Sequence, residues 1–314
     1  MPSKILSVNW FWEGKEMPQL VLTAPAKLNL SLDVVGRRTD GYHLVEMVMQ
    51  SIELCDHISL ASRTDGQIKI ACTHPHVPTG PKNLVWQAAQ LLAQASGKSS
   101  GVTITLGKSI PVAAGLAGGS TDAAAVLMGL NRMWGLNLEA RELAQLGLKL
   151  GADVPFCLMG GTALAQGIGE KLTPLPPPPP LWVVLLKPNI GVSTAEVYNN
   201  YRGTDVRTRP CTQSLVDAIQ AGAASSMVQA MGNVLESVTF AKLPLLRQLK
   251  RKALELGALA ALMSGSGPTI FALTKEYREA TAIVNALKHL VDFTCITTFK
   301  EGNYGPRICD NPSR

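Results

Sequence analysis

A glycine-rich stretch between residues 111 and 121 has the composition of a loop that binds phosphate. Three glycines let its backbone approach an anion closely and adopt positive φ: Gly115, Gly118 and Gly119. An alanine-rich helix follows to about Asn131, and a helix N-terminus presents free N–H groups and a positive dipole end. The stretch lacks the lysine of a Walker A loop and the G-x-G-x-x-G spacing. By itself it supports a phosphate site and an ordinary tight turn equally.

The start of the alanine-rich helix is predicted near Asp122, with Ser120 or Thr121 as its N-cap. A carboxylate at this end of a helix is stabilised by the dipole, but it would repel a bound phosphate. The side chain of Asp122 therefore either points away from the phosphate or faces it across a Mg²⁺ ion. A capping role is the simpler interpretation.

Lys27 and Asn29 stand two residues apart in an otherwise apolar strand, so their side chains face the same side. Burying a cation and an amide is costly unless an anionic or polar group meets them. The pattern predicts either a polar ligand at this face or an edge strand whose polar face is solvated.

Two further segments carry polar groups at predicted turns. Asp153 follows the end of a helix and, taken alone, is most simply a turn residue. Gly265 and Gly267 flank Ser266 between two apolar strands, which fits a hairpin or a second backbone nest for phosphate.

The elements that must position these residues are predicted from hydrophobic periodicity, and they indicate an α+β fold. A turn is expected at residues 37–42, and Asn83 is the expected N-cap of a helix that ends near Gly97. Strands are expected at 20–32, 44–54, 58–60, 68–71, 102–106 and 183–187, and helices at 84–97, 122–131, 138–150 and within 212–256.

Length and a proline run predict two lobes. A chain of 314 residues corresponds to about two domains, and the sequence PLPPPPP at 174–180 favours a stiff connection. We expect an N-terminal lobe over 20–173, with a mixed sheet, helices and the glycine-rich loop. A C-terminal α/β lobe is expected over 181–314, and residues 1–19 read as an extension.

Charge and composition favour a small anionic ligand. Lys and Arg number 29 against 23 for Asp and Glu, which gives a net charge of +6 and a pI near 9.0. This mild basicity suits a nucleotide or phosphate ester, and the scattered positive residues give no reason to expect nucleic acid. Hydrophobic residues make up 46% and charged residues 17%, which excludes disorder for most of the chain.

The cysteines and the apolar runs indicate a cytoplasmic protein without a membrane partner. The six cysteines include no C-x-x-C pair, so neither a zinc site nor a redox dithiol is predicted. No apolar run approaches the ~20 residues of a membrane span, and the N-terminus does not resemble a secretory signal.

Taken together and in this order, the four segments resemble the GHMP small-molecule kinases, which include galactokinase and the homoserine, mevalonate and phosphomevalonate kinases. The strings that carry the resemblance are APAKLNLSLDVVGRRTDGYH, GLAGGSTDAAAVL, GADVPF and MSGSGPTIFAL. It covers roughly residues 20–300. The GYH and GADVPF segments are most similar to the branch that phosphorylates the 2-hydroxyl of a diphosphocytidyl methylerythritol in non-mevalonate isoprenoid synthesis.

The resemblance implies a role for each segment. It implies a catalytic Lys27 and Asp153, with ATP as co-substrate, Mg²⁺ as the cofactor ion, and Ser120 or Thr121 as a metal ligand. Tyr198 is expected to stack on cytosine, and the other substrate-binding positions are Asn29, Tyr42 and His43. Gly265, Ser266 and Gly267 form the third glycine motif. The implied ATP loop is Pro111, Val112, Ala113, Ala114, Gly115, Leu116, Ala117, Gly118, Gly119, Ser120 and Thr121.

One departure and two alternatives accompany the resemblance. The family pattern has glycine where this chain has Ala117, and an alanine forced to positive φ there would be strained by roughly 1 kcal/mol. The alternatives are a GHMP kinase of a smaller alcohol, such as homoserine or mevalonate, and a non-catalytic protein that binds nucleotide or RNA. A monomer or a homodimer is expected.

Overall fold

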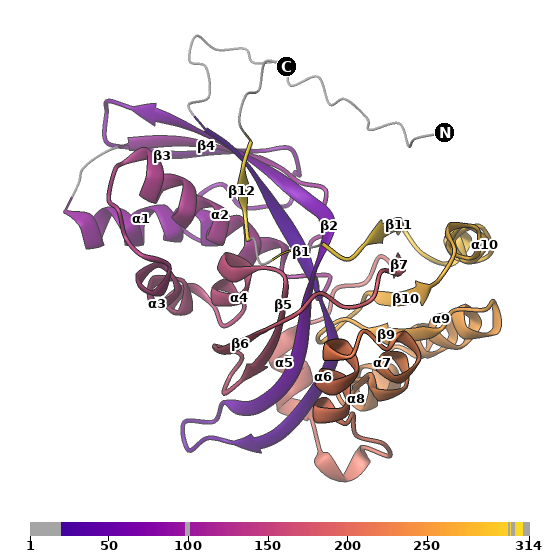
Figure 1. Ribbon diagram of the computed structural model, residues 1–314. Helices are drawn as coiled ribbons and strands as arrows, with labels where there is room; N and C mark the ends of the chain where they lie inside the picture. Colours follow the sequence, from indigo (N-terminus) through magenta and orange to yellow (C-terminus); the bar gives the residue numbers. More distant parts are fainter. Residues whose placement is uncertain (1–19, 98–100, 301, 303–304, 310–314) are drawn as a thin grey trace.

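A computed structural model describes residues 20–97, 101–300, 302 and 305–309. The predicted extension, residues 1–19, lies outside the described residues. Two long antiparallel strands, β1 (Leu20–Arg37) and β2 (His43–Arg63), run through both halves of the molecule (Figure 1). They replace the three shorter strands predicted from the sequence between residues 20 and 60. The α+β prediction is confirmed.

The larger sheet is built around this hairpin, with the strand order β12-β1-β2-β4-β3. A further strand, β5, pairs with β2 and β6, and β8 pairs with β1. The remaining strands of this sheet are β3 (Ile68–Cys72), β4 (Gly101–Gly107), β5 (Thr162–Gln166), β6 (Lys171–Leu175), β8 (Gly232–Asn233) and β12 (Arg307–Ile308). The proline run begins inside β6, where Pro174 pairs with Ala163.

The second sheet is antiparallel, with the order β11-β7-β10-β9. Its strands are β7 (Trp182–Lys187), β9 (Ala260–Met263), β10 (Ile270–Thr274) and β11 (Phe293–Thr298). Helices α1–α3 lie on one side of the long hairpin, and α6–α10 gather with this sheet on the other (Figure 1). The helices are α1 (Leu84–Ser96), α2 (Gly118–Met133), α3 (Ala140–Leu150), α4 (Val154–Met159), α5 (Thr194–Asn200), α6 (Thr212–Gln220), α7 (Ala224–Ala230), α8 (Glu236–Lys242), α9 (Pro244–Glu255) and α10 (Tyr277–Leu287).

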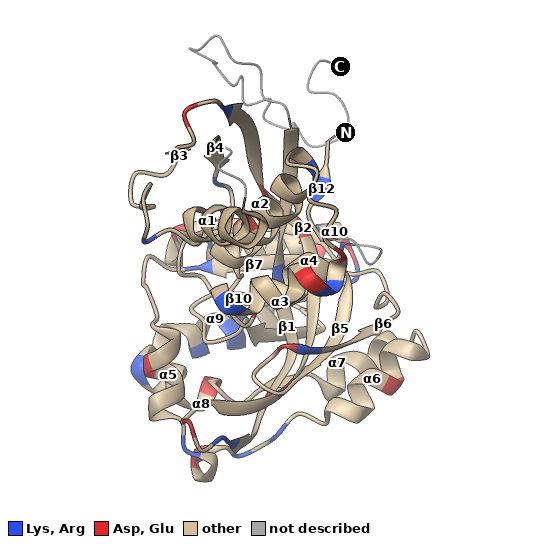
Figure 2. Cartoon of the chain, turned by 90° about the vertical axis from the view of Figure 1, so that its left-hand side faces the viewer, with Lys and Arg blue, Asp and Glu red and all other residues tan. Residues whose placement is uncertain are grey.

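Basic and acidic positions are interspersed over both halves in the view of Figure 2. This agrees with the scatter of charge expected from the sequence. Within the described ranges, no helix is long and apolar enough to cross a membrane.

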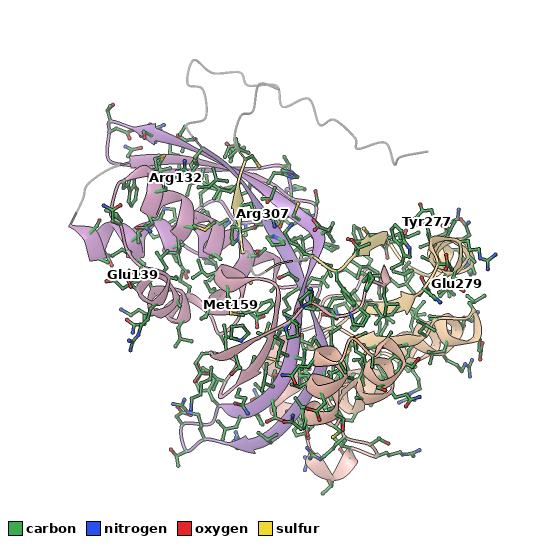
Figure 3. All side chains as sticks on the ribbon, in the orientation of Figure 1. Arg132, Glu139, Met159, Tyr277, Glu279 and Arg307 are labelled. Atoms are coloured by element: carbon green, nitrogen blue, oxygen red, sulfur yellow. The ribbon has the colours of Figure 1, made fainter. Side chains whose placement is uncertain are left out.

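Both faces of the small sheet are buried, and each face meets the hairpin. Val184 and Leu186 of β7 belong to a cluster that includes Leu32 and Val45 of the hairpin. The alternate residue Val183 belongs to another cluster, with residues of β1 and the glycine-rich loop. Side chains fill the space between the sheet and helices α9 and α10 (Figure 3). Apolar packing therefore continues from one sheet into the other.

Local sequence signals around α1 and the first turn are confirmed. The side chain of Asn83 accepts a hydrogen bond from the backbone N–H of Val85, and Gly97 ends the helix in the left-handed conformation. Both features follow from the conformational preferences of asparagine at N-caps and glycine at helix C-termini. The turn at 37–42 closes with a hydrogen bond from the N–H of Arg38 to the carbonyl of Tyr42 at 2.7 Å.

The predicted start of the next helix is wrong. Helix α2 begins at Gly118, and Ala117 is its N-cap, with φ +57° and no side-chain hydrogen bond. Ser120 and Thr121 lie inside the first turn and cap nothing. The left-handed backbone at Ala117 turns the chain into the helix three residues earlier than a Ser120 cap would, and four residues earlier than a Thr121 cap would. The strain foreseen for an alanine at this position is therefore present.

Replacing Ala117 with glycine is expected to raise the free energy of unfolding by about 1 kcal/mol, because glycine adopts positive φ without strain. The extra freedom of glycine in the unfolded chain limits the gain. Urea denaturation measures the change. The matched control is Ala125→Gly inside α2, which is expected to destabilise by at least about 1 kcal/mol. The same sign of change in both variants would contradict the prediction.

Candidate active site

A cavity of about 1020 Å³ collects most of the residues singled out from the sequence. Its wall includes Lys27, Asn29, Tyr42, His43, Asp153, Tyr198, Gly265 and Ser266, and from the glycine-rich loop Pro111–Gly115 and Ala117–Ser120. Leu116, Thr121 and Gly267 are not on the wall. Segments far apart in the sequence thus meet at one site, as a binding cavity requires.

Lys27 brings a buried positive charge to the cavity. The residue is 5% exposed, and its Nζ donates a hydrogen bond to Oδ1 of Asn29 at 2.8 Å. Its second partner is Oδ2 of Asp153 at 3.6 Å, whose side chain is one-third exposed. The two side chains predicted to share a face do so, and a carboxylate open to the cavity lies beside a buried ammonium ion. Such a pair can orient a hydroxyl group and accept its proton.

Lys27 does not lie on an open edge. Its strand pairs with β2, where Lys27 is opposite Ser51. Its N–H donates to the carbonyl of Leu116 in the glycine-rich loop at 3.1 Å. The edge-strand interpretation is therefore wrong, because the loop covers the side of β1 that the sheet leaves free at this point.

Two glycine-rich loops contact each other above Lys27. The second runs over residues 264–268 between β9 and β10. Gly115 has φ +75°, and a Cβ there would lie 2.3 Å from the carbonyl oxygen of Ser264. The hydroxyl of Ser264 donates to the carbonyl of Gly115 at 2.9 Å. Only glycine fits at residue 115, since any side chain would push the loops apart.

Asn233 and Thr239, which sequence reasoning missed, hold the second loop. The Nδ2 of Asn233 donates to the carbonyls of Met263 and Gly265, both at 2.7 Å. The hydroxyl of Thr239 donates to the carbonyl of Ser266 at 3.2 Å. Both side chains are buried. Asn233 lies in the two-residue strand β8, inside the range where only helices were predicted, so it carried no local signal for such a role.

Aromatic rings gather around His43, which lies on the cavity wall with Tyr198. The ring of His43 lies 5.4 Å from that of Tyr198 and 6.3 Å from that of Tyr201, the latter edge-on. Tyr42 is on the wall but 61% exposed. Tyr201 was not predicted, although its spacing of three from Tyr198 on α5 was a usable signal.

Burial and, secondarily, Arg37 lower the pKa of His43 below its ordinary 6.5. Its ring is therefore neutral near pH 7 and can both donate and accept hydrogen bonds.

Asp122 is neither a cap nor a solvent-exposed residue. It is 3% exposed, and its Oδ2 accepts a hydrogen bond from Nζ of Lys108 at 2.6 Å. Burial raises the pKa of Asp122, Lys108 opposes the rise, and Asp56 adds to it. The capping interpretation is wrong because the helix begins four residues earlier, which places residue 122 inside the helix.

The donors suited to a metal ion are oxygens beside the loop. Ser120 and Asp122 are on the wall, and Oδ1 of Asp122 is buried without a hydrogen-bond partner. Oγ1 of Thr121 is also buried without a hydrogen-bond partner, but Thr121 is not on the wall, which argues against its expected role as a ligand. No group of three His, Cys, Asp or Glu side chains suited to a metal occurs in the described part of the chain. The donor set fits Mg²⁺, which takes few protein oxygens and completes its shell with phosphate and water.

The wall carries more basic than acidic side chains, as an anionic ligand requires. Arg37 and Lys82 join Lys27 and Lys108 there, against three aspartates. Neither Arg37 nor Lys82 was predicted as a site residue, because isolated basic residues in turns usually face solvent.

Comparison with known families gives two matches. The GHMP kinases N terminal domain matches residues 83–161, and the GHMP kinases C terminal domain matches residues 215–292. The first match contains the glycine-rich loop and Asp153. The second contains Asn233 and the second glycine-rich loop.

Curated relatives match most of the chain. A protein of Alkaliphilus metalliredigens named 4-diphosphocytidyl-2-C-methyl-D-erythritol kinase is 50% identical over 274 residues, covering 87% of this chain and 94% of its own. A protein of Geobacillus sp. with the same name is 49% identical with the same coverage.

Solved structures with the same fold include a 4-(cytidine 5'-diphospho)-2C-methyl-D-erythritol kinase. It is 34% identical, with a TM-score of 0.76 over 90% of this chain and 100% of its own. A homoserine kinase from Cytophaga hutchinsonii aligns with a TM-score of 0.75 over 94% of this chain and 99% of its own. At 20% identity, the latter shows likeness of fold alone.

The lowered pKa of His43 can be measured by proton NMR. The C2 proton, assigned by its loss in His43→Gln, is expected to titrate with a midpoint below 6.5. Arg37→Gln is expected to move the midpoint part of the way back, because Arg37 is the smaller of the two causes. A midpoint at or above 6.5 in the unmodified protein would contradict the lowered pKa of His43.

Proposed function

The chain belongs to the 4-diphosphocytidyl-2-C-methyl-D-erythritol kinases, a branch of the GHMP kinases, and from this premise we propose how its cavity performs the reaction. It is an ATP-dependent small-molecule kinase of isoprenoid precursor synthesis. The γ-phosphoryl group of ATP is transferred to the 2-hydroxyl of 4-diphosphocytidyl-2-C-methylerythritol. The observation that carries the residue assignments is the contact of Asp153 with the buried Lys27, beside the glycine-rich loop.

Residues 111–121 hold the ATP phosphates. The start of α2 offers unpaired N–H groups and the positive end of a 16-residue helix. The close contact of Gly115 with the second loop keeps this backbone in place. Phosphoryl transfer passes through a loose transition state with charge on the equatorial oxygens, so fixed N–H groups aimed at them supply much of the catalysis.

Asp153 accepts the proton of the attacking hydroxyl, and Lys27 orients both groups. The 3.6 Å contact and the burial of Lys27 support this pairing, since opposite charges attract more strongly where water is excluded. Asn29 holds Lys27 through its Oδ1 and faces the cavity. A loose transition state demands little of the base, so a carboxylate suffices in this role.

The aromatic end of the cavity receives the cytidine group. Tyr198 and His43 lie 5.4 Å apart between ring centroids and offer apolar faces, while the neutral ring of His43 can read a base edge. Tyr42 lies at the mouth. Gly265 and Ser266 complete the wall, and Gly267 belongs to the backbone behind it. Gly265 lies next to the ammonium group of Lys27.

Mg²⁺ is the expected ion of the reaction, and Ser120 with the unpartnered Oδ1 of Asp122 would hold it. When bound, such an ion neutralises charge on the transferred phosphoryl group.

The remaining expectations from the sequence concern the lobes, the location, the oligomeric state and the partners, and they are also proposals. We propose a division into lobes at residues 174–180, a cytoplasmic location, and a monomer or homodimer without a nucleic-acid partner. The two family matches, at 83–161 and 215–292, lie on either side of the proline run and support the division.

The residue assignments are tested by ³¹P NMR with Mg-ATP and the diphosphocytidyl substrate. We expect ADP and a new phosphomonoester signal from the unmodified protein, and none with mevalonate or homoserine. Lys27→Ala and Asp153→Asn are each expected to lower kcat at least ~100-fold. The control is Arg251→Ala, which removes one charge of an exposed ion pair on α9 and should leave kcat unchanged. Near-normal turnover in either site variant would remove these residues from the mechanism.

A further inference from the structure

Asp56 is a fully buried carboxylate within β2, and the reaction described above makes no use of it. Its Oδ1 accepts hydrogen bonds from the backbone N–H groups of Ser109 at 2.6 Å and Ile110 at 2.8 Å. Its Oδ2 accepts another from Nζ of Lys108. These three donors belong to consecutive residues that lead from β4 into the glycine-rich loop. Asp56 is not on the cavity wall, so it cannot touch a nucleotide bound there.

Lys108 connects Asp56 to the other end of the loop. Its ammonium ion also donates to Asp122, in the second turn of α2, at 2.6 Å. It lies beside the helix start, because a Cβ on Gly118 would be 3.4 Å from its Nζ. Burial acts to lower the pKa of Lys108, but the two carboxylates outweigh it and raise the pKa above its ordinary value. One charged lysine thus ties together the start and the end of the loop.

The loop needs this external support because its own backbone is unfavourable. Ala113 and Ala117 both have positive φ, at 51° and 57°, which alanine adopts only at a cost. The side chain of Ile110 is buried and packs beneath Gly118, whose added Cβ would meet it at 3.1 Å. The hydrogen bond from the N–H of Ile110 to Asp56 therefore holds in place the side chain that packs beneath the start of α2. Lys27 and Asp153 lie on other elements, and their side chains pair with each other and with Asn29 rather than with Asp56 or Lys108.

We propose that Asp56 is a positioning residue for nucleotide binding, acting through Lys108, Asp122 and the two N–H groups at the start of the loop. It sets the affinity for ATP without contacting it. The proposal rests on the assignment of residues 111–121 to the ATP phosphates in the preceding subsection. Its consequence is that a residue outside the cavity controls the KM for ATP and leaves the KM for the cytidine substrate unchanged.

Two substitutions separate the charge of Asp56 from its hydrogen bonds. Asp56→Asn keeps an oxygen that can accept from the loop N–H groups but loses the charge facing Lys108. Asp56→Ala loses both. We expect the KM for ATP to rise at least ~10-fold in Asp56→Ala and by less in Asp56→Asn. The Kd for ADP, measured by calorimetry, should rise in parallel. In both variants, kcat at saturating ATP should stay within about threefold of the unmodified enzyme.

Lys300→Met is the matched control. Lys300 is 8% exposed, and its Nζ pairs at 3.0 Å with Glu53, on the same strand as Asp56. This variant is expected to lower the Tm and to leave the KM for ATP unchanged. Thermal unfolding of each variant gives the folded fraction. Asp56→Asn, the milder change, keeps the test decisive where Asp56→Ala does not fold.

Three results would overturn the proposal. They are an unchanged KM for ATP in folded Asp56→Asn and Asp56→Ala, an equal rise of KM for both substrates, or the same rise in Lys300→Met. Failure of the proposed function has a different signature, because the unmodified protein would then form no phosphomonoester from the cytidine substrate.

Discussion

The contact between the two glycine-rich loops is the constraint on which the site depends. A Cβ at residue 115 would lie 2.3 Å from the carbonyl oxygen of Ser264, so the loops can meet only where one of them has no side chain. The first loop follows a strand of the large sheet, and the second joins two strands of the small one. Their contact therefore fixes the two sheets relative to each other. Lys27 lies beneath that junction, and its N–H bonds to the first loop. Lys27, the proposed catalytic lysine, is thus held by a loop whose own position depends on both sheets.

Buried charge is the second requirement, and each charge at the site has partners that offset its burial. Lys27 has Asn29 and Asp153, while Lys108 has Asp56 and Asp122. Removing one member of a buried pair costs about 3–5 kcal/mol, a large part of the 5–15 kcal/mol that stabilises a typical domain. Apolar strands can carry these ions because the partners come from different elements. In the group around Lys108, Asp56 lies on β2, Lys108 leads into the glycine-rich loop, and Asp122 lies on α2. The same partnership that stabilises the ions also orients the charged groups that line the cavity.

The sequence predicted the features that depend on residues close together in the chain. The cap of α1 joins Asn83 to an N–H two residues away, and Lys27 and Asn29 share a face because strands alternate. It did not predict contacts between residues that are far apart in the chain. Lys108 lies 52 residues from Asp56, and Asn233 lies 30 from Met263. The start of α2 was misplaced for a related reason. A left-handed alanine replaced the side-chain cap that local preference favours, because the loop's contacts with other segments hold it there.

The pairing of β1 with β12 has a consequence for how the chain reaches this structure. Leu22 is opposite Ile308, so the edge of the large sheet joins residues from the two ends of the described chain, with Arg307 beside the crossing of the long strands (Figure 3). At Leu22 and Thr23, this edge of β1 stays unpaired until residues 307 and 308 are in place. Contacts of such high sequence separation slow folding, and open strand edges invite association. A chain that has not yet added β12 therefore keeps part of this strand edge open, and it is more prone to association than the complete fold.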